Sequence, residues 1–146
     1  MKGRSLEKAS RTSEAAGEYE KAAKLYKDDY LIDDLYEDET MVERERLIYI
    51  YTDLLKRLSL HYANIGQLRK SISTCYRILE KDYCDEDTHR LLIECFVRLG
   101  LRTRALRQYR LCTTRLRQEY ETEPSPKTQA LYRSVLSNES LRHPTA

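Results

Sequence analysis

The chain has 146 residues, 40% hydrophobic and 34% charged, with a formal net charge of +2, which suits one domain with its own core. Gly and Pro are scarce and Leu, Arg, Glu, Lys and Tyr are abundant, a mixture that favours helix over sheet. The sequence shows neither a membrane-spanning apolar run nor the apolar centre of a signal peptide, so we expect a cytoplasmic protein with no membrane partner.

The N-terminal part divides into three stretches. Residues 1–13 carry no apolar period, and we expect them to be disordered. From about Ser13 to Asp29, small and aromatic residues recur at intervals of three and four, which predicts a helix. The acidic stretch 28–40 mixes paired carboxylates with apolar residues and is expected to form an ordered loop or a short helical turn.

Five more helices follow in chain order. A long apolar arc predicts a helix over 42–65 that ends at Gly66, and the next helix covers 68–81. Asp85 is the expected N-cap of a helix that runs to Leu99 and closes at Gly100, with a partner helix over 102–120. The last helix starts at a Ser125 N-cap with Pro126 in its first position, and residues 138–146 are expected to be a disordered tail.

Two of these helix pairs form a repeat. Gly66 and Gly100 lie 34 positions apart (100 − 66), which is the tetratricopeptide period. Matching positions carry matching sizes: large apolar residues on each first helix, and the small residues Ser71 and Ala105 where the second helix crosses. Residues 18–26, preceded by Gly17, resemble the second helix of a third unit. The sequence therefore predicts an all-α fold, with tetratricopeptide-like helical hairpins stacked in a short right-handed solenoid over residues 14–137.

A solenoid of this kind leaves a concave wall built from its first helices, and such a wall suits a protein or peptide partner. Lys56 and Arg90 take equivalent places in the two repeats, so a peptide carboxylate is a reasonable ligand. The alternative is that a terminal helix covers the exposed apolar positions Leu60 and Val97. The predicted wall comprises Asp53, Lys56, Leu60, Asn64, Asp87, Arg90, Glu94, Val97 and Arg98.

A second candidate surface lies on the helix over 102–120. Residues 98–118 hold seven arginines and no acidic residue, and the helical period places five of these arginines opposite the apolar side of the helix. Such a surface would bind nucleic-acid phosphates weakly and without sequence preference, and no aromatic residue lies among the arginines to stack on bases. Leu111 lies within it, which suggests that another helix or protein docks there. We call this surface the basic ridge: Arg104, Arg107, Arg110, Leu111, Arg115 and Arg117.

The sequence contains no strong motif for a metal site or for catalysis. The cysteines Cys75, Cys84, Cys95 and Cys112 form no CxxC pair, and the histidines lie far from any paired ligand, so we expect packed thiols and no metal site. There is no glycine-rich phosphate loop and no nucleophile–base arrangement. We expect no enzyme, no catalytic residue and no cofactor.

Five segments resemble a known family in their order and spacing: YKDDYLIDDLYEDE at 26–39, ERERL at 43–47, DEDTHRLL at 85–92, RALRQY at 104–109 and EPSPKTQALY at 123–132. Together they are similar to the bacterial transcriptional activator domain, the tetratricopeptide-like module of SARP-type transcription regulators. Three positions depart from the family's pattern, where Glu39, Val42 and Thr122 stand in place of a tryptophan, a proline and a glycine. The last departure affects how the helix over 102–120 ends.

The resemblance implies a regulatory role without catalysis: self-association, intramolecular control and contact with the transcription machinery. In that family a winged helix binds DNA, and nothing before residue 14 has room for one, so DNA recognition is expected to come from a winged helix absent from this chain. Two alternatives stay open: a free-standing tetratricopeptide adaptor that grips a peptide tail, and nucleic-acid backbone binding by the basic ridge. The charges also predict a homodimer, in which the acidic stretch 28–39 of one copy contacts the basic ridge of another.

Overall fold

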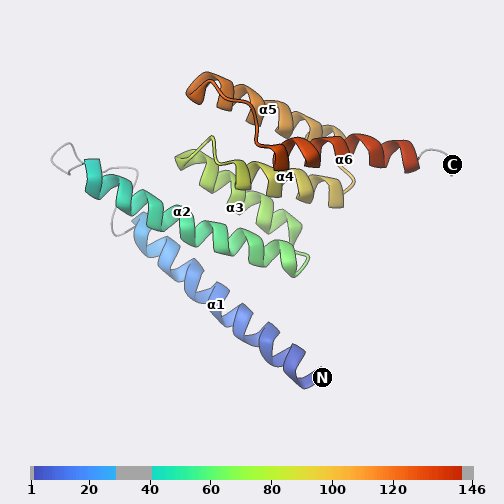
Figure 1. The fold of residues 1–146 in the computed structure, drawn as a ribbon. Helices are drawn as coiled ribbons and strands as arrows, with labels where there is room; N and C mark the ends of the chain where they lie inside the picture. Colours follow the sequence, from blue (N-terminus) through green and yellow to red (C-terminus); the bar gives the residue numbers. More distant parts are fainter. Residues whose placement is uncertain (1, 29–40, 143–146) are drawn as a thin grey trace. The chain divides into compact units, whose positions relative to one another are not determined.

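The computed structural model describes the backbone of residues 2–28 and 41–142, and the side chains of 13–27 and 41–137. The described residues form six α-helices and no strand (Figure 1): α1 (Lys2–Asp28), α2 (Met41–Asn64), α3 (Leu68–Lys81), α4 (Glu86–Arg98), α5 (Arg102–Tyr120) and α6 (Pro126–Arg142). The predicted all-α fold is confirmed. The chain divides into two compact units, Met1–Lys81 and Asp82–Ala146, and the stacking of hairpins into a solenoid stays a prediction.

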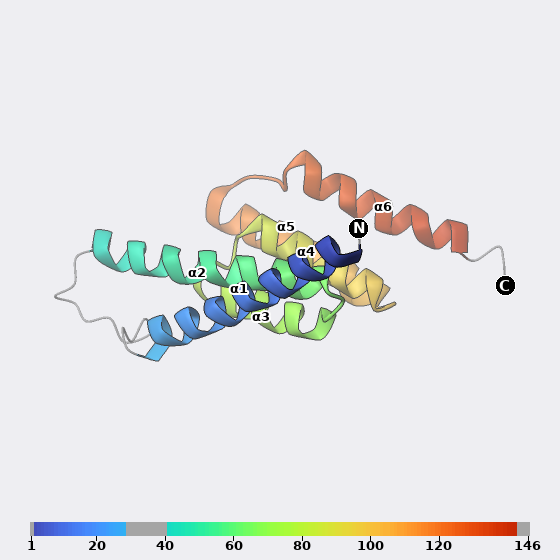
Figure 2. The same cartoon turned by 90° about the horizontal axis from the view of Figure 1, so that it is seen from below.

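The first unit contains α1, α2 and α3. α2 packs against both α1 and α3 (Figures 1 and 2). In the core of the unit, the side chains of Leu55 and Leu58 on α2 and of Ile78 on α3 are fully buried. α1 approaches α2 closely because it presents small residues, Ala16 and Ala23, to the core. Each buried methylene contributes about 0.8 kcal/mol, so this apolar contact is the main support of the unit.

A buried polar contact fixes the crossing of α2 and α3. Ser71 is fully buried, and its hydroxyl donates a hydrogen bond of 2.8 Å to the backbone carbonyl of Ser59 on α2. A serine can occupy this point because it is small and its hydroxyl finds a partner. The predicted packing notch is therefore present, and Ala105 fills the equivalent place in the second unit, where it is 1% exposed.

The 34-residue repeat appears in the backbone of the two helix turns. Gly66 and Gly100 adopt φ values of 81° and 76°, a region that an L-residue rarely enters. The same hydrogen bonds surround both glycines: Gln67 N–H to Tyr62 O and Leu101 N–H to Phe96 O are each 2.8 Å long. These bonds satisfy carbonyls at the helix ends. The two predicted hairpins, α2–α3 and α4–α5, are thus confirmed.

The second unit contains the α4–α5 hairpin and α6, which contacts both helices of the hairpin. Asp85 caps α4 as predicted, accepting a hydrogen bond of 3.1 Å from Thr88 N–H. α6 begins at Pro126 after the predicted Ser125 N-cap. The Tyr132 ring of α6 stacks on the Tyr109 ring of α5, with centroids 4.0 Å apart.

Helix boundaries differ from the prediction at both ends of the chain. α1 begins at Lys2, although residues 1–13 were expected to be disordered, because Lys, Arg, Glu, Leu and Ala have high helix propensity without an apolar period. α1 also passes through Gly17 without a turn, so the hairpin turn expected for a third repeat is absent there. α6 continues to Arg142, past the expected start of a tail at residue 138.

Some apolar residues that follow the helical period of the sequence are nevertheless exposed. Ile65 and Tyr76 are 48% and 46% exposed, because Ile65 lies beyond the end of α2 and the buried side of α3 is centred on Ser71, Cys75 and Ile78. Leu136 is likewise exposed near the end of α6. The predicted loop or turn at 28–40 lies outside the residues whose side chains are described.

Candidate functional site

The basic ridge lies on the side of α5 that faces solvent. Arg104, Arg107, Arg110 and Arg117 are exposed and Arg115 is half-buried, while Leu111 among them is 38% exposed. The opposite side of α5 is buried in the hairpin through Ala105, Gln108, Cys112, Thr113 and Leu116. The orientation of the helix therefore agrees with the helical period of its sequence.

Three arginines of the ridge are engaged within the second unit. Arg117 makes a bidentate pair with Glu123, with Nε and Nη2 at 2.7 and 2.9 Å from the carboxylate oxygens, and this pairing lowers the pKa of Glu123. Arg115 donates to the Tyr83 carbonyl at 3.3 Å and lies over the Tyr83 ring. Arg104 lies 5.9 Å from the centre of the Phe96 ring.

Arg107 and Arg110 differ from these three. Among the residues that the structure describes, neither has a hydrogen bond, an ion pair or a ring contact, and no carboxylate lies within ion-pair distance of either guanidinium. Residues three or four positions apart on a helix are neighbours, so Arg107, Arg110 and Leu111 share one turn. The ridge thus contains one turn whose charges have no partner within the described part of the chain.

The residues of the predicted concave wall divide between the two units. On α2, Asp53 forms an ion pair of 3.1 Å with Arg57, Lys56 is half-buried, and Leu60 and Asn64 are exposed. On α4, Asp87, Glu94 and Arg98 are exposed and Val97 is half-buried. The wall as one surface stays a prediction.

Arg90 is the wall residue whose surroundings were not anticipated. Its side chain is only 14% exposed and forms ion pairs with Glu86, at 3.7 Å, and with Asp87. Its Nη1 also donates a hydrogen bond of 2.9 Å to Thr128 Oγ1 on α6. The guanidinium therefore has partners within the unit, and its binding of a peptide carboxylate stays a prediction.

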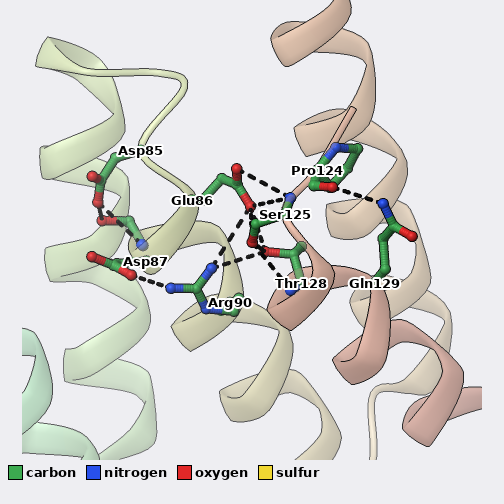
Figure 3. Close-up of polar contacts among 9 residues, drawn as sticks. Asp85, Glu86, Asp87, Arg90, Pro124, Ser125, Thr128 and Gln129 are labelled. Carbon is green, nitrogen blue, oxygen red and sulfur yellow. Dashed lines mark hydrogen bonds and ion pairs between the residues drawn. The ribbon is translucent and has the colours of Figure 1, made fainter. Parts of the chain in front are cut away.

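Arg90 belongs to a cluster that joins α4 to α6, which we call the polar clasp: Glu86, Arg90, Ser125 and Thr128 (Figure 3). The Glu86 carboxylate accepts hydrogen bonds from Ser125 N–H at 3.0 Å, from Ser125 Oγ at 2.9 Å and from Thr128 Oγ1. Thr128 is fully buried. An acidic group at a helix N-terminus also interacts favourably with the helix dipole, so Glu86 caps α6 from outside the helix.

Charge and burial oppose each other at Glu86. Burial raises the pKa of the Glu86 carboxyl, but the hydrogen bonds from Thr128 and Ser125 and the charge of Arg90 together outweigh it, and the pKa falls below 4.5. The carboxylate is therefore ionised at neutral pH and stabilises the N-terminus of α6. Two of the family segments, DEDTHRLL at 85–92 and EPSPKTQALY at 123–132, supply all four residues of the clasp, although nothing in their sequences indicates that they meet.

His89 provides a second buried polar group in this unit. Its Nε2 lies 2.8 Å from the Tyr83 carbonyl and its Nδ1 lies 2.8 Å from the Gln108 side-chain nitrogen. Because a carbonyl accepts and an amide nitrogen donates, these partners select the neutral imidazole with the proton on Nε2. Burial lowers the pKa of His89, against the opposing effect of its hydrogen bond to Tyr83.

The four cysteines are all buried and in the thiol form, as predicted for packed thiols. Burial raises the pKa of Cys112 to about 12, so this thiol is protonated and unreactive at neutral pH. Within residues 13–27 and 41–137, no group of three His, Cys, Asp or Glu side chains is arranged to hold a metal ion. Of the helices that the structure describes, none has the length and apolar character needed to cross a bilayer.

Comparison with known protein families gives one match. Residues 1–136 match the profile of the bacterial transcriptional activator domain, a family of regulatory domains rather than of enzymes. No curated protein sequence and no solved structure gave a significant match. The match spans almost the whole chain and includes the five segments quoted above. The all-α architecture, the repeated hairpins and this match together show that the chain belongs to the bacterial transcriptional activator domain family.

Proposed function

We propose that this chain is the protein-interaction module of a bacterial transcription activator, which self-associates and contacts the transcription machinery or a regulatory partner. The observation that carries the proposal is the family match over residues 1–136. Tetratricopeptide-like hairpins support it, since they expose extended helix surfaces that bind other proteins. In this proposal the module acts in the cytoplasm, and DNA is recognised by a winged helix outside the chain.

The proposal separates this role from catalysis and from sequence-specific DNA binding. The described residues hold no strand from which a wing could form, and the fully buried polar side chains of His89 and Thr128 are engaged in hydrogen bonds within the second unit. In this proposal the surface of the module binds the partner proteins, through charged and apolar side chains on the outer sides of its helices.

A tethering experiment tests the proposal. The chain is fused to a heterologous bacterial DNA-binding domain, and transcription is measured from a promoter with the matching operator upstream. Activation of several-fold over the DNA-binding domain alone is expected, together with binding of the purified chain to RNA polymerase holoenzyme. Light scattering of the purified chain tests self-association.

The control uses the same fusion protein with a promoter that lacks the operator, so that the folded chain is present but is not held at the promoter. A fusion tested on a promoter without the operator should give only the basal level. If the folded chain, checked by circular dichroism, neither activates from the operator nor binds polymerase nor associates with itself, the proposed function is wrong.

A further inference from the structure

The turn of α5 that carries Arg107, Arg110 and Leu111 combines exposed positive charge with exposed apolar surface. Both arginines are exposed and lack a partner among the described residues, whereas Arg104, Arg115 and Arg117 are engaged as described above. The side chains beside them on the same side of α5, Thr103, Thr114 and Gln118, are exposed and uncharged. We call Arg107, Arg110 and Leu111 the docking turn.

The local electrostatics of the docking turn are strongly one-sided. Residues 98–118 contain seven arginines and no acidic residue, although the whole chain has a net charge of only +2. Guanidinium groups pair with carboxylates in a planar, bidentate way, as Arg117 near the end of α5 does with Glu123 in the loop that follows. A ligand that complements the turn therefore carries carboxylates spaced to meet Arg107 and Arg110, and an apolar side chain that covers Leu111.

We propose that the docking turn binds an acidic segment of a partner protein, with carboxylates on either side of an apolar side chain that packs on Leu111. This inference rests on the proposed function and deepens it, because it names the surface and the chemistry of the partner. Arginine is enriched at protein interfaces, where it forms strong contacts at the centre of the contact area.

Two features favour a protein segment over nucleic acid. Leu111 gains nothing from a phosphate backbone, whereas an apolar side chain of a peptide removes its exposed surface from water. Base stacking needs exposed aromatic rings, but Tyr109, the aromatic residue nearest the turn, stacks on Tyr132 of α6 and is half-buried.

The experiment uses the purified full chain and a synthetic, labelled helical peptide of about 15 residues with Glu on one side and Leu at helical spacing. Binding is measured by fluorescence anisotropy. The Arg107→Glu/Arg110→Glu double variant should weaken binding about tenfold or more, because attraction is replaced by repulsion at two positions. Leu111→Ser should weaken it about threefold to tenfold through lost apolar contact.

The matched control reverses two charges elsewhere in the same unit. Lys127 and Arg133 on α6 are exposed, so Lys127→Glu/Arg133→Glu changes the net charge by the same amount without touching α5. This variant should retain binding within about twofold, since separated surface charges are screened. Circular dichroism and thermal unfolding check that all variants are folded. A peptide with Gln in place of every Glu should lose most of its affinity.

Three results would overturn the inference. The first is peptide binding that is absent, or that falls equally in the docking-turn variant and the α6 control. The second is tighter binding of a DNA duplex that the docking-turn variant abolishes, which assigns the turn to phosphates. The third is a dimer of the chain that the docking-turn variant dissociates, which assigns it to a second copy.

The tethering assay separates the failure of this inference from the failure of the proposed function. If the docking-turn variant activates transcription as well as the wild type and the peptide never binds, the inference fails while the function stands. If the peptide binds through the docking turn but the wild-type fusion never activates, the proposed function fails while the surface assignment stands.

Discussion

Replacing Glu86 by Gln removes the charge of the polar clasp with little change in shape. In the wild type the carboxylate accepts hydrogen bonds from Ser125 N–H, Ser125 Oγ and Thr128 Oγ1, and it pairs with Arg90. An amide offers one accepting oxygen instead of two, and its NH₂ group cannot accept from Ser125 or Thr128. An amide oxygen in the place of Oε2 can still accept these three bonds, but without the charge, while the NH₂ group in the place of Oε1 cannot accept the 3.3 Å contact from Ser125 N–H. One acceptor is therefore lost, and Arg90 loses one of its two ion-pair partners.

The expected loss follows from these contacts. Hydrogen bonds to a charged group contribute about 1.5–3 kcal/mol, against about 0.5–1.5 kcal/mol for neutral ones, so losing one bond and the charge of the others costs about 3 kcal/mol. For a chain of this length, that corresponds to a fall in Tm of about 6 to 12 °C. The chain has no Trp, so urea unfolding is followed by far-UV circular dichroism.

Hydrogen exchange locates the loss, because the amides of α6 should lose protection while those of α2 keep theirs. Glu94→Gln is the matched control: Glu94 lies on the same helix and is exposed, so its replacement should change stability by less than about 0.5 kcal/mol. If Glu86→Gln is as stable as this control, the clasp does not hold α6 and the reasoning fails.

Acid provides an independent test of the same carboxylate. Because the pKa of Glu86 in the folded chain is lowered below 4.5, the protein binds fewer protons at this site than the unfolded chain does. The stabilisation by Glu86 is thus fully present above pH 4.5 and is lost as the pH falls through the lower, folded pKa. The stability difference between wild type and Glu86→Gln should therefore shrink in that range, and a constant difference would contradict the assignment.

Three further predictions concern the second unit. The pKa of His89 is lowered by burial, so its NMR titration midpoint should lie below 6.5, and its stabilising effect should be lost as the pH falls through that midpoint; a midpoint above 6.5 would show that the Gln108 contact is misassigned. Glu121 has a φ of 54°, which glycine adopts without strain, so Glu121→Gly should raise the free energy of unfolding by about 0.5 to 1 kcal/mol in urea titrations, and a loss would refute this. Tyr132→Ala removes the ring stacked on Tyr109 and should lower stability by about 2 kcal/mol in the same assay, whereas a change below about 0.5 kcal/mol would mean that the stack contributes little.

The hairpins were predictable because their determinants are local and periodic. Gly66 and Gly100 mark turns that need a positive φ, and Ser71 and Ala105 mark crossings that need a small side chain. Each of these requirements concerns one residue and its neighbours in the chain, so a single sequence reveals it. The N-caps at Asp85 and Ser125 were predictable for the same reason.

The polar clasp was not predictable, because its members are far apart in sequence. Glu86 and Ser125 are 39 positions apart, and nothing in the period of α4 or α6 indicates that they meet. For the same reason Arg90 was assigned to a free surface, although Thr128 and Glu86 occupy its guanidinium. The early start of α1 was missed because the sequence of residues 2–12 has no apolar period, and helix propensity does not require one.

The clasp is also expected to set the order in which the helices of the second unit fold during synthesis of the chain. A helix capped only by its own serine can begin to form as it leaves the ribosome, but α6 takes part of its cap from Glu86, which emerges earlier within α4. The α4–α5 hairpin depends mainly on contacts between neighbouring segments and forms without α6, since local contacts cost little loop-closure entropy. α6 then docks on a finished hairpin with a carboxylate already in place, so its docking is expected to be the last step in the folding of this unit.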